Sequence, residues 1–341
     1  MEREREEERF FFSSDQNTQP GLLPSNNMSY VALLLVSSFF ASAAGFLPMS
    51  PKHVSKFTLV PKATVAGQGK EEQPFYPFAG AAEDEAMVLK AQVLQLGASL
   101  DRGQSYNPTS GTYYQERFEF ARSKVRELVD KQKGPLPTTL DAIAGEWELV
   151  FTTVPHGIFR SSPFFLAVQE AFQYAEDKTA FGEDKANLFF KLHELQTCSW
   201  GVSKIGRVAQ TIDPKAGYLY SEFDTSIFSL TVIPVLGWFK LLPTFGGCVI
   251  TAAKAKITDE SVVEMEVDYT TSKPVKGLQG LGEWIWSVKV PVGAVWKLLP
   301  WNKGRAAECS VKLVYVDEDF RVVEDLDGEL FVYTRPVLSR P

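Results

Sequence analysis

Segments that alternate apolar and polar residues follow one another after Pro137, and this pattern limits the chain to few folds. The clearest is Val263–Tyr269 (VEMEVDY), whose four apolar side chains share one face and whose three carboxylates share the other. Strict alternation over such a length predicts a half-buried β-strand. The same texture predicts strands at Glu146–Thr153, Ile205–Asp213, Tyr218–Asp224, Cys248–Ile257, Val262–Thr271, Glu308–Val316, Phe320–Glu324 and Leu330–Thr334.

Helical spacing of apolar residues marks three further segments. Ala86–Ser99 and Tyr113–Lys133 precede the strands, and Ser162–Thr179 lies among them with Ser162 as its N-cap. Asp327-Gly328 is a turn that joins the last two strands as a hairpin. About eight antiparallel strands with short turns favour a closed or nearly closed barrel, because closure removes exposed edges. The expected fold class is therefore α+β, mainly β, with N-terminal helices before the barrel.

A ten-residue pattern, PVxxxxKLLP, occurs twice, at Pro234–Pro243 and Pro291–Pro300. Proline neither donates to a sheet ladder nor continues a helix, so each copy is expected to be a short helical turn or loop. Trp and Lys beside Leu are typical of a membrane interface, although such loops can equally fold inward and plug a core. The candidates for membrane contact are Trp238, Phe239, Leu241, Leu242, Trp296, Leu298, Leu299 and Trp301.

The segment 28–70 contains no Asp or Glu and carries four lysines, and Tyr30–Phe46 within it is an apolar run rich in Ser and Ala. This combination is typical of a signal- or transit-like targeting presequence. A secretory signal or a single membrane anchor is the alternative, although the run is short for a span. Residues 1–27 lack the character expected ahead of such a core, so they are interpreted as a non-native extension that precedes a start at Met28. The expected organisation is then a helical preface over 71–137, a barrel domain over 138–335 and a tail over 336–341.

Charge and cysteine usage exclude some partners. The net charge is −7 and the basic presequence leaves the remainder more acidic still. Because phosphate binding needs a basic face, nucleic acid is not expected as a partner. Cys198, Cys248 and Cys309 form no metal-ligand spacing, so no metal is expected and buried thiols are favoured.

Four motifs together resemble the plastid lipid-associated protein, or fibrillin, family. They are Leu100–Gly103 (LDRG), Ala144–Thr153 (AGEWELVFTT), Gly206–Asp213 (GRVAQTID) and the ending Val314–Arg335, and they stand in the family's usual order. The sequence departs from the family at Val323–Asp325, where a basic turn is usual, and Pro155–Ser203 resembles an insertion.

The resemblance implies a lipocalin-like antiparallel β-barrel in the plastid, associated with thylakoid or plastoglobule surfaces. Such a protein binds or carries lipids or isoprenoids, so an apolar ligand such as a quinone, a carotenoid or a fatty acid is expected in place of a cofactor. The resemblance carries no catalytic residues and names no protein partner. A structural coat protein whose interior is filled by its own side chains is the alternative.

Candidates for particular positions follow from strand alternation. The predicted pocket walls are Trp147, Phe151, Met265, Tyr269 and Phe331. In the lipocalin-like barrel that the resemblance implies, Asp319 and Arg321 are expected to form a structural ion pair near the barrel base.

Enzyme and metal hypotheses rest on weaker patterns. His193, oriented by Glu194 or Asp213, is a candidate general base for a lipid-modifying enzyme, but a satisfied histidine on a strand is favoured. No catalytic residue is therefore assigned. The acidic residues Asp317, Glu318, Asp319, Glu324, Asp325 and Asp327 are candidates for a hard cation, with a solvated hairpin favoured instead.

Overall fold

The structure is a computed structural model that describes residues 85–104, 111–154, 157–173, 186–187, 190, 203–227, 245–276, 288–298 and 304–340. The chain divides into two compact units, Met1–Phe46 and Leu47–Pro341, and every described residue belongs to the second. The predicted presequence, the Pro234–Pro243 segment and His193 with Glu194 lie outside the described residues.

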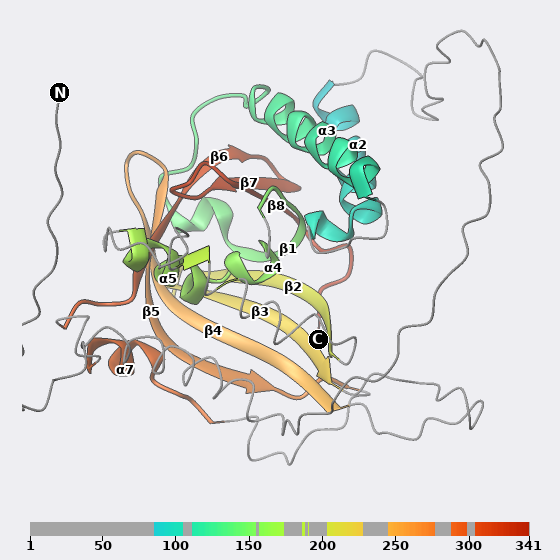
Figure 1. Cartoon of the computed structure of the whole chain (residues 1–341). Coiled ribbons are helices and arrows are strands. Elements are labelled where there is room, and N and C mark those ends of the chain that lie inside the picture. Colours follow the sequence, from blue (N-terminus) through green and yellow to red (C-terminus); the bar gives the residue numbers. More distant parts are fainter. Residues whose placement is uncertain are drawn as a thin grey trace, which may run out of the picture. The chain divides into compact units, whose positions relative to one another are not determined.

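An antiparallel sheet of eight strands forms the centre of this unit. Each strand pairs with its neighbour in chain order, and β8 pairs back onto β1, so the sheet closes into a ring (Figure 1). The predicted α+β class, with a closed antiparallel sheet preceded by helices, is confirmed. The strands are β1 (Gly145–Thr152), β2 (Ser203–Asp213), β3 (Tyr218–Ile227), β4 (Phe245–Ile257), β5 (Val262–Lys273), β6 (Glu308–Val316), β7 (Phe320–Glu324) and β8 (Leu330–Thr334).

The ring is uneven. Strands β2 to β5 run for 10 to 13 residues, whereas β7 and β8 run for five each. Two short helices, α4 (Gly157–Arg160) and α5 (Pro163–Gln173), follow β1, and α5 packs against β4, β5 and β6 (Figure 1). Phe159 of α4 meets Phe223 of β3 edge-on, with 5.5 Å between the ring centroids. The two helices therefore reach into the ring.

Two longer helices cover the outside of the short strands. Helices α2 (Glu85–Ser99) and α3 (Gly111–Val129) pack on each other and share one apolar cluster with residues of β1, β6, β7 and β8. Gly97 makes the close approach possible, because a Cβ there would lie 2.5 Å from the carbonyl oxygen of Val150. The predicted helix Tyr113–Lys133 corresponds to α3, which buries one stripe with helical spacing: Tyr114, Phe118, Ala121, Val125 and Leu128.

Two smaller elements complete the ring's surroundings. The 3₁₀ turn η3 (Leu140–Ile143) precedes β1 and buries Ile143 completely. Helix α7 (Val292–Leu298) begins directly after Pro291 and packs against β5, where a Cβ on Gly293 would lie 2.2 Å from the carbonyl oxygen of Val267. The second PVxxxxKLLP segment is thus helical over Val292–Leu298, which is one of the two conformations, helical turn or loop, that were expected.

Candidate functional site

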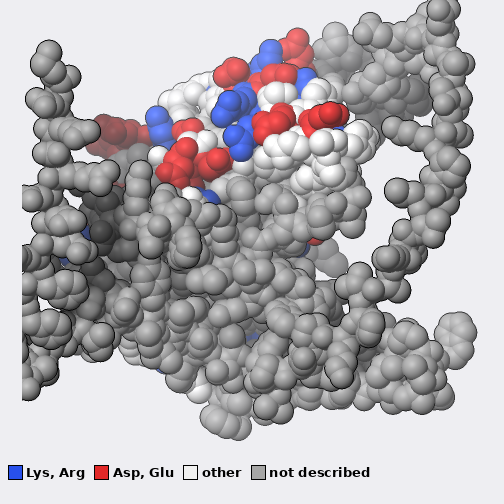
Figure 2. All heavy atoms as spheres, in the orientation of Figure 1, with Lys and Arg blue, Asp and Glu red and all other residues white. Residues whose placement is uncertain are grey.

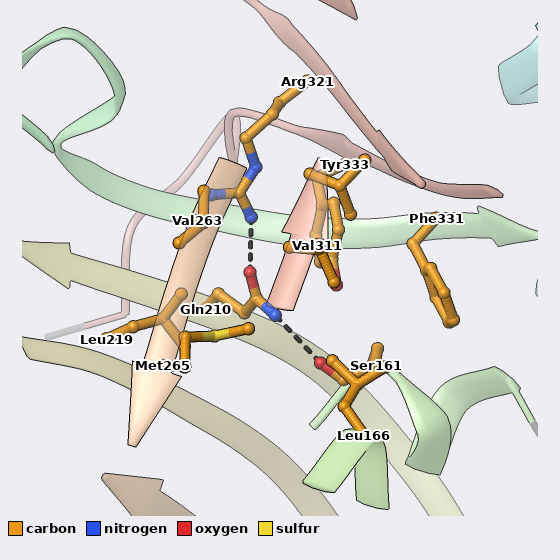
Figure 3. A pocket seen from close by; sticks show the side chains of 11 residues that line it. Ser161, Leu166, Gln210, Leu219, Val263, Met265, Val311, Arg321, Phe331 and Tyr333 are labelled. Atoms are coloured by element: carbon orange, nitrogen blue, oxygen red, sulfur yellow. Dashed lines mark hydrogen bonds between the residues drawn. The ribbon is translucent and has the colours of Figure 1, made fainter. Parts of the chain in front are cut away.

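The inside of the ring is largely filled by its own side chains. Trp147, Arg321, Tyr333 and Phe331 are among its largest fully buried residues. A cavity beside Arg321, Tyr333 and Phe331 measures about 10 Å³, which is near the minimum for a single water molecule. It is lined by Ser161, Leu166, Gln210, Leu219, Val263, Met265, Val311, Arg321, Val323, Phe331 and Tyr333 (Figure 3).

Among the described residues that line this cavity, Arg321 alone is charged, and it is 2% exposed. Its Nη2 donates to Oε1 of Gln210 at 2.5 Å, and its buried Nε donates to no described atom. The guanidinium carbon lies 4.5 Å from the ring centroid of Tyr333 and 5.1 Å from that of Trp147. Burial lowers the pKa of Arg321 to about 10, so the guanidinium remains charged at neutral pH.

A short polar path runs from Arg321 to the helices that reach into the ring. Gln210 accepts from Arg321 and donates from Nε2 to the carbonyl oxygen of Ser161 at 2.9 Å (Figure 3). Burial raises the pKa of the Tyr333 hydroxyl to about 12, although Arg321 and a hydrogen bond with Ser161 oppose this shift. The remaining walls are apolar, so the site combines one buried cation with a hydrocarbon surface.

Trp147 lies inside the ring near the start of β1. Its indole Nε1 donates to the carbonyl oxygen of Ile143 at 2.9 Å, and the guanidinium carbon of Arg335 lies 3.7 Å from the ring centroid. Arg335 also donates to the carbonyl oxygens of Ala144 and Glu146, at 2.7 and 3.2 Å. Trp147 is therefore held by two guanidinium groups, an arrangement that combines cation–π contact with full burial.

Two of the five predicted pocket walls, Met265 and Phe331, line the cavity. Trp147 is buried inside the ring beside Arg321 and is not among the lining residues. The other two predictions are wrong. Phe151 belongs to the cluster beneath α2 and α3, with 5.8 Å between its ring centroid and that of Phe118. Tyr269 is only partly buried, and the ammonium of Lys289 lies over its ring at 4.6 Å.

Both errors have the same physical cause. The register between β1 and β8 shifts between Leu149 and Phe151, and that between β4 and β5 shifts at the residues preceding Tyr269. A β-bulge places one extra residue on a strand, so alternation changes sides beyond it. Phe151 and Tyr269 follow such bulges and therefore face outward.

The predicted ion pair between Asp319 and Arg321 is also wrong. Asp319 is exposed in the turn before β7, whereas Arg321 points into the ring. Within the described part of the chain, no carboxylate lies within ion-pair distance of Arg321. Asp319 and Arg321 are two positions apart on the chain, but Asp319 precedes β7, so strand alternation does not apply to it.

The described candidate residues of the second PVxxxxKLLP segment differ in exposure. Trp296 is 8% exposed and meets Phe164 of α5 edge-on at 6.2 Å, whereas Leu298 is 81% exposed. Lys297 pairs with Glu266 at 2.9 Å. Among the helices described here, none is long and apolar enough to cross a membrane. Trp238, Phe239, Leu241, Leu242, Leu299 and Trp301 lie outside the described residues.

An apolar surface that was not predicted lies on α2. Met87 is 64% exposed, and Val88 and Leu94 are 39% exposed each. Ala91 and Ala98 are exposed beside them, and no charged residue occurs from Ala91 to Leu100. A helix that faces water normally carries charged residues on that face. The absence of charge after Lys90 is visible in the sequence and could have indicated this surface.

The acidic residues near the C-terminus are held mainly by basic and amide partners. Lys90 pairs with Asp317 at 2.5 Å, and Gln169 donates to Asp325 at 3.3 Å. Arg160 lies 3.6 Å from Asp325 and 3.4 Å from Asp327, so α4 and α5 are tied to the hairpin between β7 and β8. The described residues contain no group of three His, Cys, Asp or Glu placed to hold a metal ion.

A second, more open hollow of about 550 Å³ lies along β4, β5 and β6 beside α5. Its described lining mixes two lysines, Lys254 and Lys256, with four glutamates, and Lys256 pairs with Glu264 at 2.7 Å while Lys297 of α7 pairs with Glu266. Figure 2 shows a similar mixture of basic and acidic side chains over α3. Neither surface therefore offers a field of one sign, and the interior remains the better candidate site.

Comparison with known proteins gives no match for this chain. No protein-family model, no curated protein and no solved structure matches the chain.

Proposed function

We propose that the chain is a lipid-associated protein of plastids that attaches peripherally to thylakoid or plastoglobule surfaces and binds lipids or isoprenoids. The observation that carries this proposal is the uncharged outer face of α2, formed by Met87, Val88, Ala91, Leu94 and Ala98. We refer to these five residues as the α2 face. The other side of the same helix is buried against the ring, so this face is available to a partner.

The size of the α2 face favours reversible attachment. Full burial of a Met, Val or Leu side chain is worth about 1.5–3 kcal/mol, and the three larger members are between 39% and 64% exposed. Together they supply a few kcal/mol, which is comparable with weak, reversible anchoring and far from permanent insertion. Leu298 on α7 adds an exposed leucine over β5.

A lipid surface suits the α2 face better than an anionic partner does. The α2 face carries no cation, and the neighbouring Lys90 and Lys131 pair with Asp317 and Glu85. An uncharged galactolipid or triacylglycerol surface therefore fits it by hydrophobic contact alone. Helices before a closed antiparallel ring also support the lipocalin-like architecture that the fibrillin resemblance implies.

A structural coat protein with no internal ligand is the second candidate. The observation that favours it is the cavity of about 10 Å³, since ligand pockets usually measure about 300–1,000 Å³. Both candidates require attachment to lipid and differ in whether the ring takes up a molecule.

Flotation with vesicles tests the attachment. The variant Met87→Gln/Val88→Gln/Leu94→Gln should partition at least tenfold less into neutral galactolipid vesicles than the wild type, which corresponds to about 1.4 kcal/mol. The matched control is Leu326→Gln/Val337→Gln/Leu338→Gln, because these three side chains are also exposed, at 52%, 107% and 87%. The control should float like the wild type. Equal flotation of both variants, or no flotation of the wild type, would refute attachment through the α2 face.

The proposed compartment has a separate test. A reporter fused to residues 28–70 should enter plastids, because this acid-free, lysine-bearing segment has targeting character. A cytosolic or secreted reporter would contradict the plastid proposal while leaving lipid attachment untouched.

A further inference from the structure

Arg321 presents a buried positive charge that no described carboxylate neutralises. Its surroundings are the rings of Trp147 and Tyr333, the amide of Gln210 and apolar side chains of β5 and β6. A buried charge is costly unless it is paired and hydrogen-bonded. The other buried arginine of the described part, Arg160, lies beside Asp325 and Asp327.

The unused donor of Arg321 indicates what would complete the site. A carboxylate accepts two parallel hydrogen bonds from the edge of a guanidinium group. On that edge, Nη2 donates to Gln210 and the buried Nε donates to no described atom. A carboxylate in place of the Gln210 oxygen would accept from both nitrogens.

We propose that the ring binds the carboxylate head of a long-chain fatty acid at Arg321, with the acyl chain directed along the cavity toward α4 and α5. This inference rests on the proposed lipid-binding function and specifies its ligand. The head displaces Oε1 of Gln210 from the guanidinium group, and the bound carboxylate neutralises the buried charge.

The cavity walls favour an acyl chain over a small hydrated anion. Beyond Arg321 the cavity is bounded by Leu219, Val263, Met265 and Val311, and it ends at Leu166 of α5 (Figure 3). These side chains offer hydrocarbon contact and no further cation. The cavity of about 10 Å³ is too small for a chain, so uptake requires α4 and α5 to shift. Met265 has an unbranched, adaptable side chain that can accommodate such a change.

The test compares oleate with oleyl alcohol, which has the same chain and no carboxylate. Isothermal titration of the full chain should show at least tenfold tighter binding of oleate. Arg321→Gln should abolish this preference. Arg207→Gln, which removes an arginine from the outer face of β2, should keep it. Acetate should not bind measurably, because it lacks the chain; acetate binding as tight as oleate would overturn the proposal in favour of a small-anion site.

Gln210→Glu provides a second variant that does not remove the arginine. It places a carboxylate of the chain against Arg321, so the midpoint of thermal unfolding should rise and the preference for oleate should disappear. A preference that survives in Gln210→Glu would refute the site.

A measurement on the wild type alone covers the case in which the variants do not fold. The carboxyl-¹³C resonance of bound oleate should keep the shift of the ionised form at a pH at which free oleate is protonated. A bound carboxyl that titrates like free oleate would overturn the proposal. If wild-type protein binds both probes equally, the headgroup site is wrong and lipid binding stands; if it binds neither and fails to float, the proposed function itself is wrong.

Discussion

Arginines on the inner and outer faces of the ring have opposite kinds of neighbours. Arg207 on the outer face of β2 pairs with Glu148 at 2.5 Å, with Glu222 at 3.4 Å and with Glu146. Arg321 on the inner face of β7 has an amide and two aromatic rings as its neighbours. The difference arises from strand alternation, since the outward positions of β1 carry glutamates where the inward positions carry Trp147 and Leu149. The outer arginine is thus neutralised by carboxylates of the chain, whereas no described carboxylate lies within ion-pair distance of the inner one.

The largest expected effect comes from the most tightly held interior residue. Trp147→Ala should destabilise the fold by about 3–5 kcal/mol, because it removes a fully buried indole and leaves a cavity beneath two guanidinium groups. Urea unfolding followed by circular dichroism measures the loss. Leu326→Ala, at a residue that is 52% exposed, is the control and should change little. A loss below about 1.5 kcal/mol for Trp147→Ala would contradict a packed interior.

The next prediction tests which aromatic residues lie under the helices. Phe151→Ala should cost about 3 kcal/mol and should speed amide exchange in α2 and α3, because its ring packs against Phe118 of α3. Tyr269→Ala should cost about 1 kcal/mol or less, since the ring is only partly buried. The reverse order of the two losses would mean that the bulges do not turn these residues outward.

These two residues also mark the limit of what the sequence predicts. Alternation and turn residues identified all eight strands, and the bounds of Glu308–Val316, Phe320–Glu324 and Leu330–Thr334 agree with β6, β7 and β8. Alternation failed where a bulge inserts one residue, because the insertion depends on pairing with another strand and leaves no local pattern.

The partners of Arg321 could not be predicted from the sequence, for a related reason. Gln210 lies 111 positions away along the chain, and only closure of the ring brings it to Arg321. The charge-free stretch from Ala91 to Leu100, in contrast, is local and was available from the sequence. Whether the Pro234–Pro243 segment contacts lipid stays a prediction, because it lies outside the described residues.

A pair of substitutions on α7 separates core packing from lipid contact. Trp296→Ala should lower the free energy of unfolding by about 2–3 kcal/mol, because its ring packs on Phe164. The loss should be somewhat smaller than for a fully buried tryptophan, since Trp296 is 8% exposed. Leu298→Gln should leave stability within about 0.5 kcal/mol and lower flotation with vesicles, because the side chain is 81% exposed. Chemical denaturation and flotation of the same preparations measure both quantities. Unchanged stability of Trp296→Ala would place its ring at the surface.

Acid should loosen the outer helices before it affects the interior. Burial alone would raise the pKa of Asp317, but hydrogen bonds from Lys90, Tyr315 and two backbone amides hold it below the ordinary value. A carboxyl whose pKa is lowered by folding stabilises the fold above its unfolded value and loses this contribution as pH falls through the folded value. Stability should therefore fall with acid below about pH 4. Asp317→Asn should cost about 1–2 kcal/mol at neutral pH and flatten this acid dependence. An unchanged acid profile would contradict the role of the Lys90–Asp317 link.

The smallest expected effect returns to the two arginines. Arg207→Gln should cost about 1 kcal/mol, because the side chains of its three glutamates are still 13% to 32% exposed and water screens the pairs in part. The destabilisation by Arg207→Gln should be smaller in about 1 M salt, where the screening length is about 3 Å. The effect of Gln210→Glu, in contrast, should be insensitive to salt, because Arg321 is 2% exposed and ions do not reach it. Thermal unfolding of both variants at low and high salt makes the comparison. If the effect of Gln210→Glu were screened as strongly as that of Arg207→Gln, water and ions would have access to the interior, and the distinction between the two faces would fail.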